Sequence, residues 1–198
     1  QLGQDIDGEA AGDNSGIAVS VNSVGNIVAI GAYKNNGSAT DAGHVRIYNY
    51  NGSSWNQIGQ DIDGEATSDN SGSTVSLSSD GNTVAIGAYG NDGNGSSAGH
   101  VRRYNYNGTS WTQLGGDIDG EAAGDESGSS VSLSSDGNTV AIGAHLNDGN
   151  GSNSGHVRVY NLSNLTNANG CDSTAILNLT INNSDTSYTN ITACDSLV

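Results

Sequence analysis

The sequence contains no proline, phenylalanine or methionine, and only 5% of its 198 residues are aromatic. Apolar residues make up 33% of the chain, which excludes a single large hydrophobic core. No apolar run approaches the roughly 18 residues that a membrane-spanning helix needs. We therefore expect several small sheets that each bury a modest face, and no insertion into a membrane.

Positive charge is also scarce, because 21 acidic residues stand against five Lys and Arg and give a net charge of −16. Nothing in such a chain could neutralise phosphates, so nucleic acid is excluded as a partner. The partners that this charge permits are cations, above all Ca²⁺, and a surface glycan or a protein ligand with a basic patch. The sequence has no nucleophile elbow and no phosphate-binding loop, and we expect no enzymatic activity.

Cysteine occurs only at Cys171 and Cys194. In an oxidising compartment these residues could form a disulfide across a hairpin, or each could pair with a cysteine of a neighbouring module. The chain shows neither an initiator methionine nor a signal peptide, so we expect a mature or excised segment of a secreted protein.

A repeat of 56 residues dominates the sequence. The motif Asp-Ile-Asp-Gly-Glu-Ala at 5–10 recurs at 61–66 and 117–122, and the steps are 61 − 5 = 56 and 117 − 61 = 56. Gly-His-Val-Arg at 43–46 recurs with the same spacing. We divide the chain into three repeat units, a linker and a segment of different character, with the bounds 1–56, 57–112, 113–161, 162–169 and 170–198.

Within a unit the apolar residues alternate with polar ones, which is the period of a half-buried strand. Val75 and Leu77 are followed by a predicted two-residue turn at Asp80-Gly81, and Val84 and Ile86 continue beyond it. A long Gly/Asn/Asp/Ser loop, a third strand, a turn at 107–108 and a fourth strand complete the unit. We predict an all-β fold in which each 56-residue unit is a β-propeller blade of four antiparallel strands, followed by a small β-sandwich-like segment.

The residues of the second unit resemble a known repeat. Ser68-Asp69-Asn70-Ser71-Gly72, Val75 and Ile86-Gly87-Ala88 are similar to the FG-GAP repeat of integrin-α-type propellers. Serine stands where that repeat carries phenylalanine. The family's calcium loop between the first two strands is reduced to Asp80-Gly81, so the resemblance implies the fold but no calcium site at this turn.

The C-terminal segment resembles a different group of proteins. Cys-Asp-Ser at 171–173 and 194–196 is similar to the recurring units of long surface adhesins in type IX-secreting bacteria. This resemblance implies a secreted, cell-surface protein with tandem β stalk modules.

The repeated acidic motif predicts a metal site. In extended backbone, residues i, i+2 and i+4 point the same way, so three carboxylates could converge on Ca²⁺. Alternatively, the motif is a turn and the last aspartate caps the entry to the first strand. The candidate ligands in the three units are Asp5, Asp7, Glu9, Asp13, Asp61, Asp63, Glu65, Asp69, Asp117, Asp119, Glu121 and Asp125.

Other repeated positions are candidates for ligand contacts. Tyr33 and Tyr89 could pack between blades or form a sugar-stacking platform, while Asp92 and Asp148 lie in flexible Gly/Asn loops. Trp55 and Trp111 should pack between blades. For the histidines that recur at 44, 100 and 156 we expect structural hydrogen bonds within each blade.

Most acidic residues fall in the long loops, which emerge on one face of a propeller. We therefore predict a non-enzymatic adhesin or binding module whose acidic loop face binds Ca²⁺ or a ligand. The alternatives are a lectin with glycan pockets and a structural filament or stalk subunit that self-associates. Three blades are fewer than a closed propeller uses, so we expect further blades or an association of copies.

Overall fold

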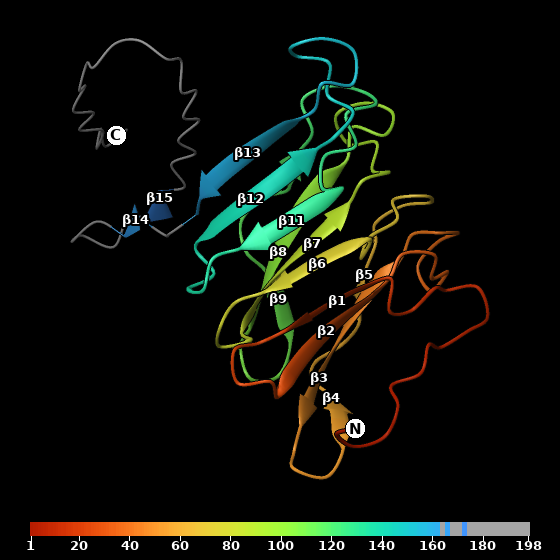
Figure 1. Cartoon of the computed structure of the whole chain (residues 1–198), viewed down its shortest axis with the longest axis vertical. Helices are drawn as coiled ribbons and strands as arrows, with labels where there is room; N and C mark the ends of the chain where they lie inside the picture. Colours follow the sequence, from red (N-terminus) through yellow and green to blue (C-terminus); the bar gives the residue numbers. More distant parts are fainter. Residues whose placement is uncertain (163–164, 167–171, 174–198) are drawn as a thin grey trace, which may run out of the picture.

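A computed structural model of the chain describes residues 1–162, 165–166 and 172–173 (Figure 1). The predicted β-sandwich-like segment at 170–198 lies outside these residues apart from one two-residue strand, and Cys171 and Cys194 lie outside them altogether. The described residues form β-strands, turns and bends, with no helix. This confirms the predicted all-β fold class.

Each repeat unit forms most of one antiparallel sheet, and the first two sheets also take a short strand from the start of the next unit. The first sheet consists of β1 (Ala18–Val21), β2 (Ile27–Ala32), β3 (His44–Tyr50), β4 (Trp55–Gln57) and β5 (Ile62–Asp63). The second sheet consists of β6 (Thr74–Leu77), β7 (Thr83–Ala88), β8 (His100–Tyr106), β9 (Trp111–Gln113) and β10 (Ile118–Asp119). The third contains β11 (Ser130–Leu133), β12 (Thr139–Ala144) and β13 (His156–Asn161), and a separate pair joins β14 (Leu165–Thr166) to β15 (Asp172–Ser173).

The fourth strand of a blade is longer than the sequence pattern predicts. Both β4 and β5 pair with the same strand, β3, in the registers Tyr48 with Gln57 and Val45 with Ile62. Between these pairs, the four residues 58–61 lie opposite only two residues of β3, so the outer strand has a bulge between β4 and β5. Gly59, with a positive φ of 74°, lies in this bulge. As a result, the Ile-Asp pair of the acidic motif belongs to a strand in the first two sheets, not to the loop predicted for it.

The two short connections differ from the predicted turns, the first in its length and the second in its position. Between β6 and β7, Ser78 N donates to Thr83 O over 2.9 Å, so the loop spans 79–82. Asp80 stabilises it by accepting hydrogen bonds from the Ser78 hydroxyl and the Asn82 backbone. Burial raises the pKa of the Asp80 carboxyl, but the hydrogen bonds from Ser78 and Asn82 together outweigh burial and lower it. The connection between β8 and β9 is shorter, because Asn107 N donates to Ser110 O over 3.1 Å and this bond encloses only residues 108–109, one position later than the predicted turn.

The three sheets pack face to face, with β1, β6 and β11 side by side along the centre (Figure 1). One core lies between the first two sheets, where Val75 and Leu77 are buried with Val45 and Ile47. A second core, built around Val101 and Ile142, lies between the second and third sheets. Small apolar residues are sufficient because each core is a thin layer between two sheets.

Backbone contacts hold neighbouring units in the same register. Leu77 N donates to the Ser20 hydroxyl and Leu133 N donates to the Ser76 hydroxyl, both over 3.0 Å. These bonds are 56 residues apart, so the second unit sits on the first as the third sits on the second. The indole of Trp111 is 3% exposed and donates to the carbonyl of Ile58, which itself bonds to β3 of the first sheet, so Trp111 packs between two sheets, as predicted.

Candidate functional site

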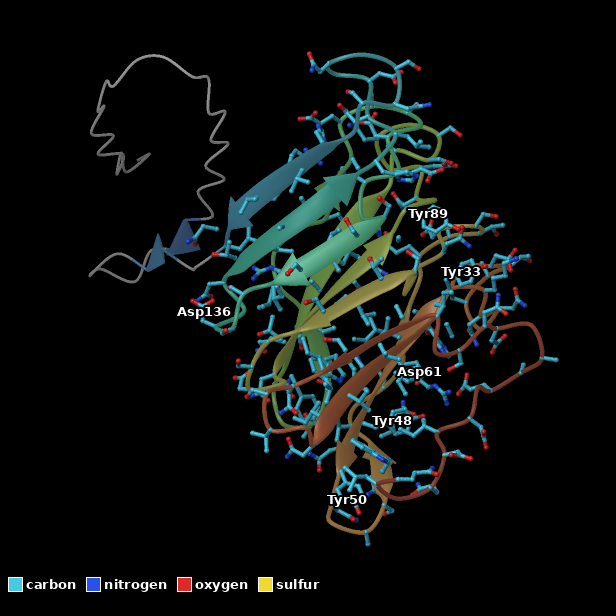
Figure 2. All side chains as sticks on the ribbon, in the orientation of Figure 1. Tyr33, Tyr48, Tyr50, Asp61, Tyr89 and Asp136 are labelled. Carbon is cyan, nitrogen blue, oxygen red and sulfur yellow. The ribbon has the colours of Figure 1, made fainter. Side chains whose placement is uncertain are left out.

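The long loops of the three units surround a pocket of about 310 Å³. Every unit contributes to it, and the lining residues are Ile17, Tyr33, Ser73, Tyr89, Glu126, Ser129 and His145. Figure 2 shows Tyr33 and Tyr89 near each other beside these loops, whereas Asp136 and Tyr50 lie at distant short connections. The pocket is therefore on the loop face for which the sequence predicts ligand binding.

The repeat itself explains why Tyr33, Tyr89 and His145 meet. They are 56 residues apart, and each directly follows the second strand of its sheet, after Ala32, Ala88 or Ala144. Because the three sheets stack in one register, equivalent strand ends converge. Two of these residues were ligand candidates, whereas His145 was missed because the third copy replaces tyrosine. Its position in the repeat was the signal that could have found it.

The Tyr89 hydroxyl of the pocket keeps its proton at neutral pH. Burial raises the pKa of the Tyr89 hydroxyl, and the neighbouring Tyr33 and the negative charges of Glu126 and Asp41 raise it further. Asn14 Nδ2 lies 3.4 Å from the Tyr33 hydroxyl, and His145 Nε2 lies 3.8 Å from a Glu126 oxygen. The pocket thus combines two aromatic rings with donors and acceptors suited to hydroxyl-bearing ligands.

The predicted metal residues separate into two groups. Asp13, Asp69 and Asp125 are buried and cap turns. Asp13 Oδ2 accepts from Ala10 N at 3.2 Å and from Asn35 Nδ2 at 2.9 Å. Asp69 and Asp125 accept the corresponding backbone bonds in their own units. These contacts agree with the alternative prediction, in which the last aspartate of the motif is a cap and not a metal ligand.

A different set of side chains comes together at the boundary between units. Glu9, His44 and Asp61 form boundary cluster 1, and Glu65, His100 and Asp117 form boundary cluster 2. In each cluster one imidazole nitrogen and two carboxylate oxygens lie within 4.8 Å of one another. The grouping differs from the predicted one, because Glu9 meets an aspartate of the next repeat and not Asp5, Asp7 and Asp13.

The other acidic candidates have separate positions. Asp5 Oδ1 accepts a hydrogen bond of 2.6 Å from Gln1. Arginines of the third strands bind the backbone carbonyls of Asp7, Asp63 and Asp119. Burial and the nearby Asp61 raise the pKa of the Asp63 carboxyl, because like charges meet there.

Asp92 and Asp148 are exposed and shape the loops that contain them. Asp92 Oδ1 accepts from Ser97 N, and Asp148 Oδ1 accepts from Asn153 N, both over 2.7 Å. Neither residue lines the pocket.

His100 departs from the structural hydrogen-bonding role predicted for it. His100 is 1% exposed, and neither of its ring nitrogens has a hydrogen-bond partner among the described residues. The pKa of His100 is lowered, first by burial and then by the charge of Arg102, so its imidazole is neutral at neutral pH. The sequence reasoning missed the boundary clusters because their members lie far apart along the chain.

A comparison with protein families matches residues 118–160 to the FG-GAP repeat. These residues cover most of the third unit, and the first two units carry the same motifs at 56-residue spacing. No curated protein matches the chain. Within the described residues, no helix is long and apolar enough to cross a membrane.

Solved structures with a similar chain path include two bacterial proteins. One, described as a 6-phosphogluconolactonase from Bacteroides uniformis, has a TM-score of 0.51 at 10% identity and matches 83% of this chain. The other, hydrazine synthase from Kuenenia stuttgartiensis, has a TM-score of 0.48 at 16% identity and matches 74% of it. The chain spans 41% and 34% of these two structures, respectively. The first likeness supports the fold alone.

Proposed function

We propose that the chain is a non-enzymatic binding module of a secreted, surface-displayed bacterial adhesin, and that the pocket is its ligand site. The observation that carries this proposal is the convergence of Tyr33, Tyr89 and His145 from three units on one pocket. Aromatic rings beside serine hydroxyls and a carboxylate suit a glycan, whose apolar faces stack on rings while its hydroxyls form hydrogen bonds.

A glycan array tests the proposal. We expect retention of a subset of surface glycans by the full chain, and loss of this binding in Tyr33→Ala and Tyr89→Ala. Tyr50→Ala is the matched control, because Tyr50 packs against Trp55 in the hairpin of β3 and β4, with the rings tilted, and does not line the pocket. Equal losses in all three variants, or no glycan retained by the parent chain, would argue against this ligand class.

We further propose that the acidic loop face binds Ca²⁺. Carboxylates dominate this face, and the net charge of −16 attracts divalent ions. A bound ion at a hundredfold excess over its Kd would stabilise the fold by about 2.7 kcal/mol. Thermal melts of the metal-free protein with and without added Ca²⁺ test this, and identical transitions would contradict it.

A specific feature favours self-association as a second role. Val19 and Val21 are 64% and 59% exposed, although their equivalents Val75 and Leu77 are buried against the preceding sheet. Val157 and Val159 of the third sheet are also exposed, although Val45 and Ile47, at the equivalent positions of the first sheet, are buried. The two exposed faces are therefore equivalent to the two surfaces that pack together between neighbouring sheets. A second copy of the chain could pack its first sheet against the third sheet of this chain, head to tail.

Analytical ultracentrifugation tests this role. We expect concentration-dependent association of the parent chain and its loss in Val157→Lys/Val159→Lys, while Val24→Lys serves as a control at an exposed turn. A chain that stays monomeric at every concentration contradicts the role.

Secretion and surface display are supported by the resemblance of the Cys-Asp-Ser motifs to type IX-secreted adhesins and by the FG-GAP match. Antibody labelling of intact cells that express the protein tests this location. Labelling only after lysis would contradict it.

A further inference from the structure

The third strands of the first two sheets begin with a histidine that is almost completely buried. His44 and His100 are each 1% exposed. For His100, neither ring nitrogen has a hydrogen-bond partner among the residues that the structure describes. Leaving a buried polar group unpaired is costly, so an unpaired imidazole nitrogen facing carboxylates indicates a ligand position.

The Nδ1 atom of this imidazole faces the carboxylates of the boundary cluster. His100 Nδ1 lies 3.8 Å from Asp117 Oδ2, and a Glu65 oxygen completes the group. In boundary cluster 1, His44 Nδ1 lies 3.8 Å from both Glu9 Oε2 and Asp61 Oδ2. The same arrangement thus occurs twice, with the glutamate and histidine from one unit and the aspartate from the next.

An arginine or a glutamine side chain contacts one oxygen of each carboxylate in the boundary clusters. In boundary cluster 2, Arg102 Nη1 lies 3.1 Å from Glu65 Oε1, and Gln113 Nε2 donates to Asp117 Oδ1 over 2.7 Å.

In boundary cluster 1, Arg46 lies 3.5 Å from Glu9 Oε1 and Gln57 donates to Asp61 Oδ1 over 2.6 Å. The opposite oxygens, Glu9 Oε2 and Asp61 Oδ2, are those nearest to the imidazole. Outer partners of this kind orient the ligands of metal sites.

The donor set indicates the class of ion. Zinc binds imidazole nitrogen and carboxylate oxygen at about 2.0–2.2 Å with tetrahedral geometry, which places two ligand atoms about 3.4 Å apart. The observed 3.8 Å between Nδ1 and Oδ2 is close to this spacing. Calcium takes six to eight oxygen ligands, so a buried imidazole selects against it.

We propose that boundary clusters 1 and 2 are binding sites for a divalent metal of the zinc type, one ion per cluster. Each ion would be bound by His, Glu and Asp with one position open, and it would join two neighbouring units. The third unit has Glu121 and His156 at 3.6 Å, but Ser173 stands 56 residues after Asp117, where a third aspartate would be needed. The proposal does not depend on the proposed glycan site.

Equilibrium dialysis of the full chain with Zn²⁺, followed by elemental analysis, tests this. We expect two bound ions per chain in the presence of excess Ca²⁺. His44→Gln and His100→Gln should each lose one ion, and the double variant should lose both. His156→Gln is the matched control and should retain two. No bound zinc, displacement by calcium, or two ions in the double variant would overturn the proposal.

A second measurement covers the case in which a histidine variant does not fold. Asp61→Asn and Asp117→Asn change a partly exposed carboxylate and should each weaken one site about tenfold or more, as titration with Zn²⁺ would show. Co²⁺ bound to the parent chain should give the absorption of tetrahedral nitrogen and oxygen coordination. Unchanged affinities in both asparagine variants, or an octahedral Co²⁺ spectrum, would contradict the assignment.

Discussion

The indole Nε1 of Trp111 donates a hydrogen bond of 2.8 Å to the backbone carbonyl of Ile58, which lies 53 residues earlier. Trp55 makes the same bond to Leu2, at 2.9 Å and at the same separation. Gln60 reinforces the contact, because its side chain donates to Trp111 O and accepts from Trp111 N. The tryptophan of each of the first two blades thus links its own outer strand to the segment of equivalent sequence that precedes it.

Replacing Trp111 should be costly. Trp111→Ala removes a side chain that is 3% exposed together with its bond to Ile58, so we expect a loss of about 3–5 kcal/mol in the free energy of unfolding. Trp55→Ala is the matched control and should cost less, because Trp55 is only half-buried. Urea titration followed by circular dichroism measures both, and equal losses would contradict the interpretation.

Three equivalent glycines should differ in their tolerance of alanine. A Cβ on Gly31 would lie 1.9 Å from the backbone oxygen of Gly72, and one on Gly87 would lie 2.1 Å from Gly128 O. A Cβ on Gly143 would meet only the side-chain hydroxyl of Ser130 within 3 Å, and a hydroxyl can rotate away. We expect Gly31→Ala and Gly87→Ala to lower the melting temperature strongly and Gly143→Ala to change it little, which thermal melts would show.

Acidification should destabilise the metal-free protein through His100. Burial lowers the pKa of His100, whereas an unfolded histidine takes up a proton near pH 6.5. The unfolded state therefore binds more protons below this pH, so the stabilising contribution is complete above it and decreases as the pH falls. Unfolding titrations in EDTA between pH 7.5 and 5 measure this. His100→Gln should flatten the dependence, and an unchanged slope would contradict the prediction.

Asp13 should act as a cap and not as a calcium ligand. Asp13→Ala removes the bonds to Ala10 N and Asn35 Nδ2, and we expect a loss of about 1–3 kcal/mol. This loss should be equal in Ca²⁺ and in EGTA. A loss seen only in calcium would instead make Asp13 a ligand, as the carboxylate motif first suggested.

The disulfide between Cys171 and Cys194 stays a prediction, because both residues lie outside the described part of the chain. Thiol labelling of the unreduced, unfolded protein should find no free cysteine. In the chain-entropy account, a loop of this length stabilises the fold by about 3 kcal/mol. Two labelled thiols would rule out both the bridge and pairing with another module.

The sequence by itself determined the repeated strand pattern. Alternation is a local property, because successive side chains of a strand point to opposite faces. Val75 and Leu77 could therefore be assigned to one face, and the 56-residue spacing predicted equivalent sheets. Turn residues such as Asp80-Gly81 gave the place of a connection, although its length depended on hydrogen bonds between Ser78 and Thr83.

Only the tertiary structure decided which distant residues meet and which apolar faces are covered. His44, Glu9 and Asp61 share a cluster because a bulge near Gly59 sets the register in which β5 pairs with β3. Val19 and Val75 occupy the same position of the repeat, yet one is 64% exposed and the other 9%. The physical reason is that a strand's own sequence fixes the face to which its side chains point, whereas burial and ligand grouping depend on the sheet packed against that face.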